Sequence, residues 1–235
     1  MNWLWERRQQ FFFTLLLVLT ALASAWGYQR FRGEYILYHK AENLFINQDY
    51  RGAIEVFQQA FALGLDLPQA RRRLADSYLA TRNFSPAFEL YKKIARDYPG
   101  DAEVAAKLAQ LHSQFGQPRQ ALVIWARLAQ ENPGQARYLF EAGKAHQDLS
   151  QYPEAERLFN EVLQMDPNSA AAKRGLADIY SWTGRYDQAV DLLRDILTQS
   201  PRDRSARIKL GRVLSWRGDL GAAIMEYQKA LEDAP

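Results

Sequence analysis

Histidines are the first residues to test for catalytic or metal chemistry, because imidazole transfers protons near neutral pH and binds metal ions. The chain has three, His39, His112 and His146, and the last two lie 34 residues apart. Equivalent residues of stacked helices are about 8 to 10 Å apart, whereas zinc ligands bond at about 2 Å. We therefore expect His112 and His146 to pack at the repeat position that Tyr78 and Tyr180 occupy in other units, and to share no metal ion.

No other motif predicts a reaction. The sequence has no glycine-rich phosphate loop, no nucleophile elbow and no zinc-binding helix signature. It has no cysteine, which excludes disulfides, thiolate metal sites and a lipid-modified amino-terminal cysteine. Neighbouring carboxylates such as Glu154 and Glu156 are typical of a solvated helix face. We expect no enzyme activity, no cofactor and no metal.

A spacing of 34 residues runs through the chain. Six alanines follow it, and five prolines follow it in step, each 12 residues after an alanine. This period is typical of helix-turn-helix solenoids, in which a unit buries its apolar face only by stacking on its neighbours. The alanines are Ala53, Ala87, Ala121, Ala155, Ala189 and Ala223, and the prolines are Pro99, Pro133, Pro167, Pro201 and Pro235.

Each period fits two helices joined by a turn. Within residues 102–135, apolar residues recur at three- and four-residue spacing, which predicts helices with one apolar face. Gly116, Gly184 and Gly218 are expected to make turns, because glycine adopts positive φ without a steric cost. The proline that closes each unit is expected to end its second helix.

These features resemble the tetratricopeptide repeat. The family's large-then-small pair appears as Leu74 and Ala75, and its later aromatic residue appears as Tyr91 and Trp125. The resemblance implies an all-α fold: a right-handed superhelical solenoid of six helix-turn-helix units. The units are residues 34–67, 68–101, 102–135, 136–169, 170–203 and 204–235.

Composition fits an ordered, nearly neutral solenoid. Apolar residues make up 48% of the chain and charged residues 24%. The net charge of +3 comes from residues 1–40, since the remainder holds 25 basic and 25 acidic residues. Nucleic-acid binding needs clustered positive charge, so we expect no nucleic-acid partner.

Residues 11–28 predict a transmembrane anchor. They carry no charge, and eighteen helical residues reach about 27 Å, close to the thickness of a bilayer core. A short head, residues 1–10, precedes this segment, and a linker, residues 29–33, follows it. A cleaved secretory signal stays open as an alternative, because small residues at Ala21, Ala23 and Ala25 resemble a cleavage site.

Arginines flank both ends of this segment, so the charge bias across it is nearly balanced. Because the head is short, we expect a single-pass protein of the bacterial inner membrane with its solenoid in the periplasm. A cytoplasmic solenoid, or one released into the periplasm after signal cleavage, is the alternative.

The resemblance also implies where a partner binds. In this family, the first helix of each unit lines a concave groove. We expect Arg72 to meet Asp76, and Arg174 to meet Asp178, on single helix faces. The candidate groove residues are Arg72, Asp76, Arg137, Phe140, Lys144, Arg174, Asp178, Trp182, Arg212 and Trp216.

Trp182 and Trp216 occupy equivalent places in SWTG and SWRG. Either they pack between the first helices of successive hairpins, or they face the groove as an aromatic platform for a peptide or a sugar chain.

The last two helices should leave an apolar edge uncovered, since solenoid ends need a polar cap. A partner or a second copy of the chain would cover this edge. Its candidate residues are Leu214, Ile224, Tyr227 and Leu231.

The sequence thus predicts a membrane-tethered, non-catalytic scaffold that binds another envelope or membrane protein. The alternative is a module of exopolysaccharide synthesis or export, because similar repeats handle polymer or its secretion partners there.

Overall fold

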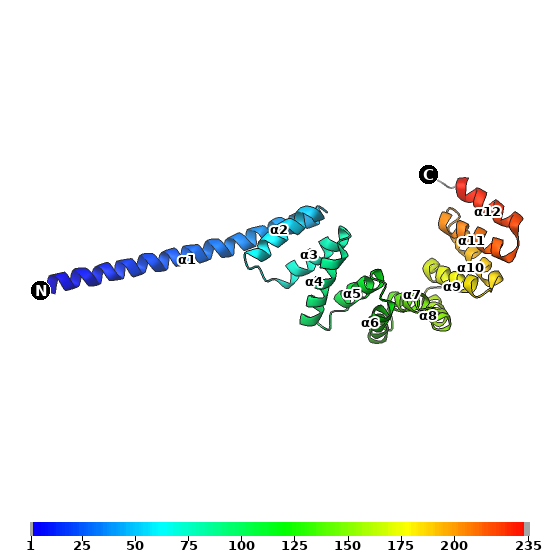
Figure 1. Cartoon of the computed structure of the whole chain (residues 1–235), viewed down its shortest axis with the longest axis horizontal. Coiled ribbons are helices and arrows are strands. Elements are labelled where there is room, and N and C mark those ends of the chain that lie inside the picture. Colours follow the sequence, from blue (N-terminus) through cyan, green and yellow to red (C-terminus); the bar gives the residue numbers. More distant parts are fainter. Residues whose placement is uncertain (1, 233–235) are drawn as a thin grey trace. The chain divides into compact units, whose positions relative to one another are not determined.

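The computed structural model describes the backbone of residues 2–232 and the side chains of residues 12–27 and 33–232. The described chain consists of helices and short connections, with no strand among these residues (Figure 1). The helices are α1 (Asn2–Ile46), α2 (Tyr50–Ala62), α3 (Pro68–Ala80), α4 (Phe84–Asp97), α5 (Ala102–Gln114), α6 (Pro118–Glu131), α7 (Ala136–Asp148), α8 (Tyr152–Met165), α9 (Ala170–Trp182), α10 (Tyr186–Gln199), α11 (Arg204–Arg217) and α12 (Leu220–Glu232).

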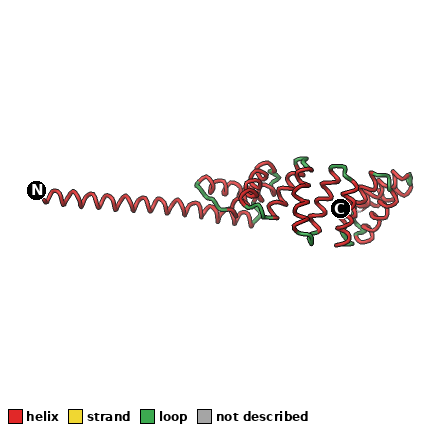
Figure 2. The backbone as a smooth tube through the Cα atoms, turned by 90° about the horizontal axis from the view of Figure 1, so that it is seen from below, coloured by secondary structure: helices red, strands yellow, loops and turns green. Residues whose placement is uncertain are grey.

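The helices form two compact units, Met1–Asp101 and Ala102–Pro235. Within each unit, consecutive helices pair as hairpins with short loops between them, as the red and green tube shows (Figure 2). The first helices of the hairpins begin at residues 68, 102, 136, 170 and 204. The all-helical repeat architecture predicted from the 34-residue period is therefore confirmed.

The first unit departs from the prediction at α1. A linker was expected at residues 29–33, but α1 passes through them as one uninterrupted helix. The segment contains no proline, and once a helix is nucleated each added residue gains a hydrogen bond. A glycine such as Gly33 costs only about 1 kcal/mol in a helix interior. The end of α1 then packs on α2, where the rings of Tyr38 and Phe57 lie 6.4 Å apart.

The predicted transmembrane anchor over residues 11–28 is not confirmed. Within the residues that the structure describes, no helix is long and apolar enough to cross a membrane. Both end residues of the predicted segment lie outside the described side chains.

Prolines end the second helices as expected. Helices α4, α6, α8 and α10 end at Asp97, Glu131, Met165 and Gln199, each two residues before a proline of the series. The residue before a proline is restricted to extended conformations, so a helix cannot continue into it. Pro235 lies outside the described residues.

The turns confirm the glycine prediction and extend it. Gly116, Gly184 and Gly218 have φ of 66°, 76° and 99°. The equivalent residues of the other hairpins also have positive φ, although they are not glycine: Gln48 (62°), Arg82 (58°) and Ser150 (58°). The packed hairpin therefore imposes the left-handed conformation even where the residue type disfavours it.

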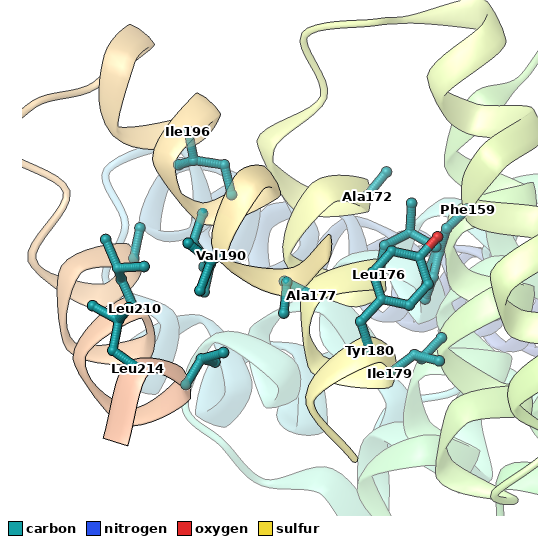
Figure 3. Close-up of a cluster of buried hydrophobic side chains, with 14 of the residues drawn as sticks. Phe159, Ala172, Leu176, Ala177, Ile179, Tyr180, Val190, Ile196, Leu210 and Leu214 are labelled. Atoms are coloured by element: carbon teal, nitrogen blue, oxygen red, sulfur yellow. The ribbon is translucent and has the colours of Figure 1, made fainter. Parts of the chain in front are cut away.

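The repeated alanines are buried in the helix packing. Five of them are completely buried, and Ala223 is 3% exposed. Figure 3 shows a buried hydrophobic cluster whose residues come mainly from α8, α9, α10 and α11. At its edge, Phe159 lies between two glycines. A Cβ atom added at Gly143 would lie 2.8 Å from its ring, and one added at Gly175 would lie 2.6 Å away.

We expect Ala121→Leu to destabilise the chain by about 1 to 3 kcal/mol, because three extra carbons have no room at a completely buried contact. Ala126→Leu is the matched control, since Ala126 is exposed on the same helix. Urea unfolding followed by circular dichroism measures both. Equal stabilities of the two variants would contradict the packing assigned to the alanine series.

Candidate partner-binding surfaces

The predicted groove residues fall into two groups, one in each unit. Arg72 and Asp76 lie on α3 of the first unit and are half-buried. The others lie on α7, α9 and α11 of the second unit, and their exposure varies. Arg137, Lys144, Trp182, Arg212 and Trp216 are exposed, whereas Phe140, Arg174 and Asp178 are half-buried.

The expected pairs within single helices are wrong. Arg72 pairs with Asp101 instead of Asp76, and Asp76 accepts a hydrogen bond from the hydroxyl of Tyr91. A helix of the solenoid has close neighbours on several sides, so a long side chain finds a partner on another element more readily than along its own surface.

The second unit repeats this arrangement. Arg174 pairs with Asp203, which also accepts a hydrogen bond from the backbone N–H of Ala206 at the start of α11 (2.9 Å). Burial alone would raise the pKa of Asp203, but the hydrogen bonds from Ala206 and Arg174 hold it below its usual value. Asp178 accepts from Nζ of Lys209 at 2.5 Å. These charges join successive hairpins and are not free for a partner.

The side chains of Phe140 and Lys144 also make contacts within the fold. The ring of Phe140 packs on that of Phe159, with centroids 5.6 Å apart. Lys144 lies 5.7 Å from the Phe140 ring and donates a hydrogen bond to Glu141 (3.0 Å).

Trp182 and Trp216 remain the most exposed aromatic residues of the predicted groove. Their exposed fractions are 51% and 47%. Trp182 rests against Tyr152 at the start of α8, with ring centroids 5.7 Å apart. The guanidinium of Arg212 lies 5.3 Å from the Trp216 ring. Neither indole is a buried wedge between helices; each is anchored on one side and open to solvent on the other.

A cluster around Glu156 was not predicted. Arg185 donates two hydrogen bonds to the Glu156 carboxylate (3.0 and 2.7 Å), and the Tyr180 hydroxyl donates a third (3.1 Å). The bond from Arg185 holds the pKa of Glu156 below its usual value, whereas burial and then Glu156 raise the pKa of Tyr180. Glu156 precedes Arg185 by 29 residues, the same separation as in the Arg72–Asp101 pair, and searching for opposite charges at this interval would have found it.

The histidines take part in hairpin turns. His112 Nδ1 lies 2.7 Å from Oε1 of Gln117, and His146 Nδ1 lies 2.7 Å from Oε1 of Gln151. Each contact links a first helix to the N-cap residue that precedes the second helix. The described residues contain no group of three or more side chains that could hold a metal ion together.

The carboxyl-terminal edge is apolar, with one correction. Ile224, Tyr227 and Leu231 are exposed on α12, as predicted. Leu214, in contrast, is 1% exposed, because it points into the cluster of α8 to α11 (Figure 3). The exposed face of α12 also includes Leu220.

A cleft in the first unit was not predicted either. It has a volume of about 450 Å³ and is lined by residues of α2, α3 and α4. Because α3 packs on both α2 and α4, we take α3 as the floor of the cleft and the other two helices as its walls. The apolar lining residues are Phe61, Leu74, Tyr78, Pro86 and Leu90.

Comparison with protein families identifies the repeats. One tetratricopeptide repeat profile matches residues 38–102, and a second matches residues 83–145 and 146–210. The chain belongs to the tetratricopeptide repeat family. None of the curated proteins matches it significantly.

Solved structures agree on the fold. A tetratricopeptide repeat protein from Parabacteroides merdae is 19% identical, with a TM-score of 0.77, over 87% of this chain and 81% of that one. MamA is 21% identical, with a TM-score of 0.60, over 68% and 94% of the two chains. YrrB, described as a tetratricopeptide repeat protein with an unusual peptide-binding site, is 19% identical, with a TM-score of 0.62, over 72% and 88%.

The pKa of Glu156 predicts a pH dependence of stability. Because folding lowers this pKa, the contribution of Glu156 is fully present above about pH 4.5, its ordinary pKa, and is lost as the pH falls through the folded value. We expect Glu156→Gln to lower the free energy of unfolding at pH 7 by about 1 kcal/mol and to flatten its decline in acid. Urea unfolding at several pH values measures this.

Asp191→Asn, at an exposed carboxylate of α10, is the control and should preserve the acid dependence of the unmodified chain. A Glu156→Gln profile parallel to that of the unmodified chain would show that this carboxylate does not contribute.

Proposed function

We propose that the chain is a non-catalytic scaffold that binds a peptide segment of a partner protein on α9 and α11. The observation that carries this is the pair of half-exposed indoles, Trp182 and Trp216, on successive first helices. Tryptophan is enriched among the residues that dominate binding energy, since it contributes a large apolar area with little loss of side-chain entropy. Their anchoring on Tyr152 and beside Arg212 holds them ready for a ligand.

Charge favours a peptide with acidic residues. Arg137 and Arg212 are exposed on α7 and α11, whereas Asp178 and Asp203 already bind Lys209 and Arg174. The acidic groups nearby are thus neutralised by the fold, and the cations are open to a partner. A neutral polysaccharide would make no use of these cations.

The second part of the proposal is that α1 attaches the scaffold to a membrane. Residues 12–27 carry no charge and are all exposed along the helix. Two of their hydroxyls donate to carbonyls of the same helix: Thr20 to Leu17 (2.9 Å) and Ser24 to Thr20 (2.6 Å). This is how hydroxyl side chains are accommodated in apolar surroundings. In this proposal the hairpins lie in the periplasm and the partner is an envelope protein.

The Trp182→Ser, Trp216→Ser double variant tests the binding surface. Tagged full-length protein is cross-linked in cells and purified, and its partners are quantified by mass spectrometry. We expect one or more partners to fall by about tenfold in the double variant, as loss of two central aromatic contacts implies. The control is Val123→Ser, which removes an exposed apolar side chain from α6, a second helix. An unchanged set of partners would refute the assignment.

Flotation with vesicles of phosphatidylethanolamine and phosphatidylglycerol tests the membrane proposal. We expect the full chain to float with the vesicles, and Leu16→Arg, Leu19→Arg to remain at the bottom, because charges are costly in an apolar layer. Ile36→Arg is the control, since Ile36 is exposed on the same helix beyond the uncharged stretch. Equal flotation of both variants would contradict attachment through residues 12–27.

A further inference from the structure

The α2–α4 cleft of the first unit has an equivalent region, its counterpart, in a later repeat of the same chain, and that region contains an ion pair that the cleft lacks. The counterpart lies 102 residues later, three repeat periods on, around α8, α9 and α10. There Lys173 takes the place of Arg71, and Asp195 takes the place of Lys93. Nζ of Lys173 bonds to Asp195 at 2.5 Å, and Lys173 is only 5% exposed. An ion pair thus bridges floor and wall in the second unit.

In the first unit this bridge cannot form, because Arg71 and Lys93 are both cations. Arg71 turns instead to two carboxylates, Asp66 and Asp97, the latter at 3.0 Å. The residues 102 positions after these aspartates are Asn168 and Gln199, which hydrogen-bond to each other at 3.0 Å. The α2–α4 cleft and its equivalent region around α8, α9 and α10 therefore differ in all of these polar contacts.

The result is an unbridged apolar cleft with a cation at its rim. Phe61, Leu74 and Leu90 line it, and Lys93 is exposed beside them. Within the described residues, Lys93 has no ion-pair partner. The volume of about 450 Å³ lies in the range of pockets that bind ligands or peptide side chains.

We propose that this cleft binds an extended peptide of a partner protein, which brings an apolar side chain and a neighbouring carboxylate. The apolar side chain enters between Phe61, Leu74 and Leu90, and the carboxylate pairs with Lys93. At the position where the counterpart has the carboxylate of Asp195, this wall has Lys93, which forms no ion pair with the neighbouring Glu89 and can therefore pair with a carboxylate of the peptide.

The other rim residues favour a peptide over an aliphatic acid. Gln58 donates its amide to the Tyr78 hydroxyl (2.8 Å), which leaves its carbonyl oxygen as an acceptor. Glu89 offers a second acceptor on the opposite wall. Backbone N–H groups of a peptide would use both acceptors, whereas an aliphatic acid has no donors for them. The cleft is made by α2, α3 and α4 and is separate from the tryptophans of α9 and α11.

The test begins with a displayed library of random short peptides, selected on the immobilised full-length chain. We expect enrichment of peptides in which an apolar residue neighbours Asp or Glu. Enriched sequences are then synthesised with a fluorescent label, and their affinity is measured by anisotropy. Lys93→Asp restores the carboxylate found at Asp195, which would pair with Arg71 and close the cleft. We expect it to weaken binding by about tenfold or more.

Lys92→Asp is the matched control, because Lys92 is an exposed neighbour on α4 that does not line the cleft. It should leave the affinity unchanged. Thermal unfolding checks that both variants are folded. A folded Lys93→Asp chain that binds no peptide supports the proposal.

Three outcomes would overturn it: no enrichment, equal affinities of the Lys92 and Lys93 variants, or saturable binding of laurate without acidic peptides. If binding is lost in the Trp182→Ser, Trp216→Ser variant instead, the peptides occupy the other surface. That result would remove this proposal while supporting the proposed function.

Discussion

Close approach of helices at small residues is the constraint on which the rest of the structure depends. The clearest case is Phe159, whose ring lies between Gly143 and Gly175 with no room for a Cβ atom at either. A single hairpin cannot bury its own apolar face, so stability comes from stacking one hairpin on the next. The completely buried alanines keep the helices near enough for this stacking. Large side chains such as Trp125 then fill the space between them.

The same stacking decides which charges serve the fold and which are open to partners. Arg72, Arg174 and Lys209 all bond to aspartates on neighbouring elements, and Glu156 is held by Arg185 and Tyr180. A position on a first helix is therefore not enough to identify a charged residue as a binding residue. Exposed cations such as Arg212 and Lys93 are better candidates, because Arg212 lies beside the Trp216 ring and Lys93 lies beside the apolar cleft.

The binding surfaces proposed for this chain depend both on positions where the repeats have the same residue type and on positions where they differ. Trp182 and Trp216 keep the period and place an exposed indole on each of two successive first helices. The α2–α4 cleft arises from a departure, since Lys93 replaces the carboxylate that Asp195 supplies three periods later. Identical hairpins would present the same surface in every repeat. A difference in charge between repeats allows one repeat to form a different kind of site.

The sequence by itself determined the helices, their pairing and the buried face, because a 34-residue period locks alanine, aromatic and proline positions to one hairpin geometry. It also indicated the exposed edge at Ile224, Tyr227 and Leu231. It could not determine that Leu214 is buried, that α1 continues through residues 29–33, or that Arg72 and Arg174 leave their own helices. The burial of Leu214 and the pairing of Arg72 and Arg174 depend on which groups meet across separate helices, and a spacing along one helix carries no information about distances between elements. The positive φ of Gln48, Arg82 and Ser150 has the same origin: the tertiary packing of the hairpin fixes the turn, and the residue adopts it.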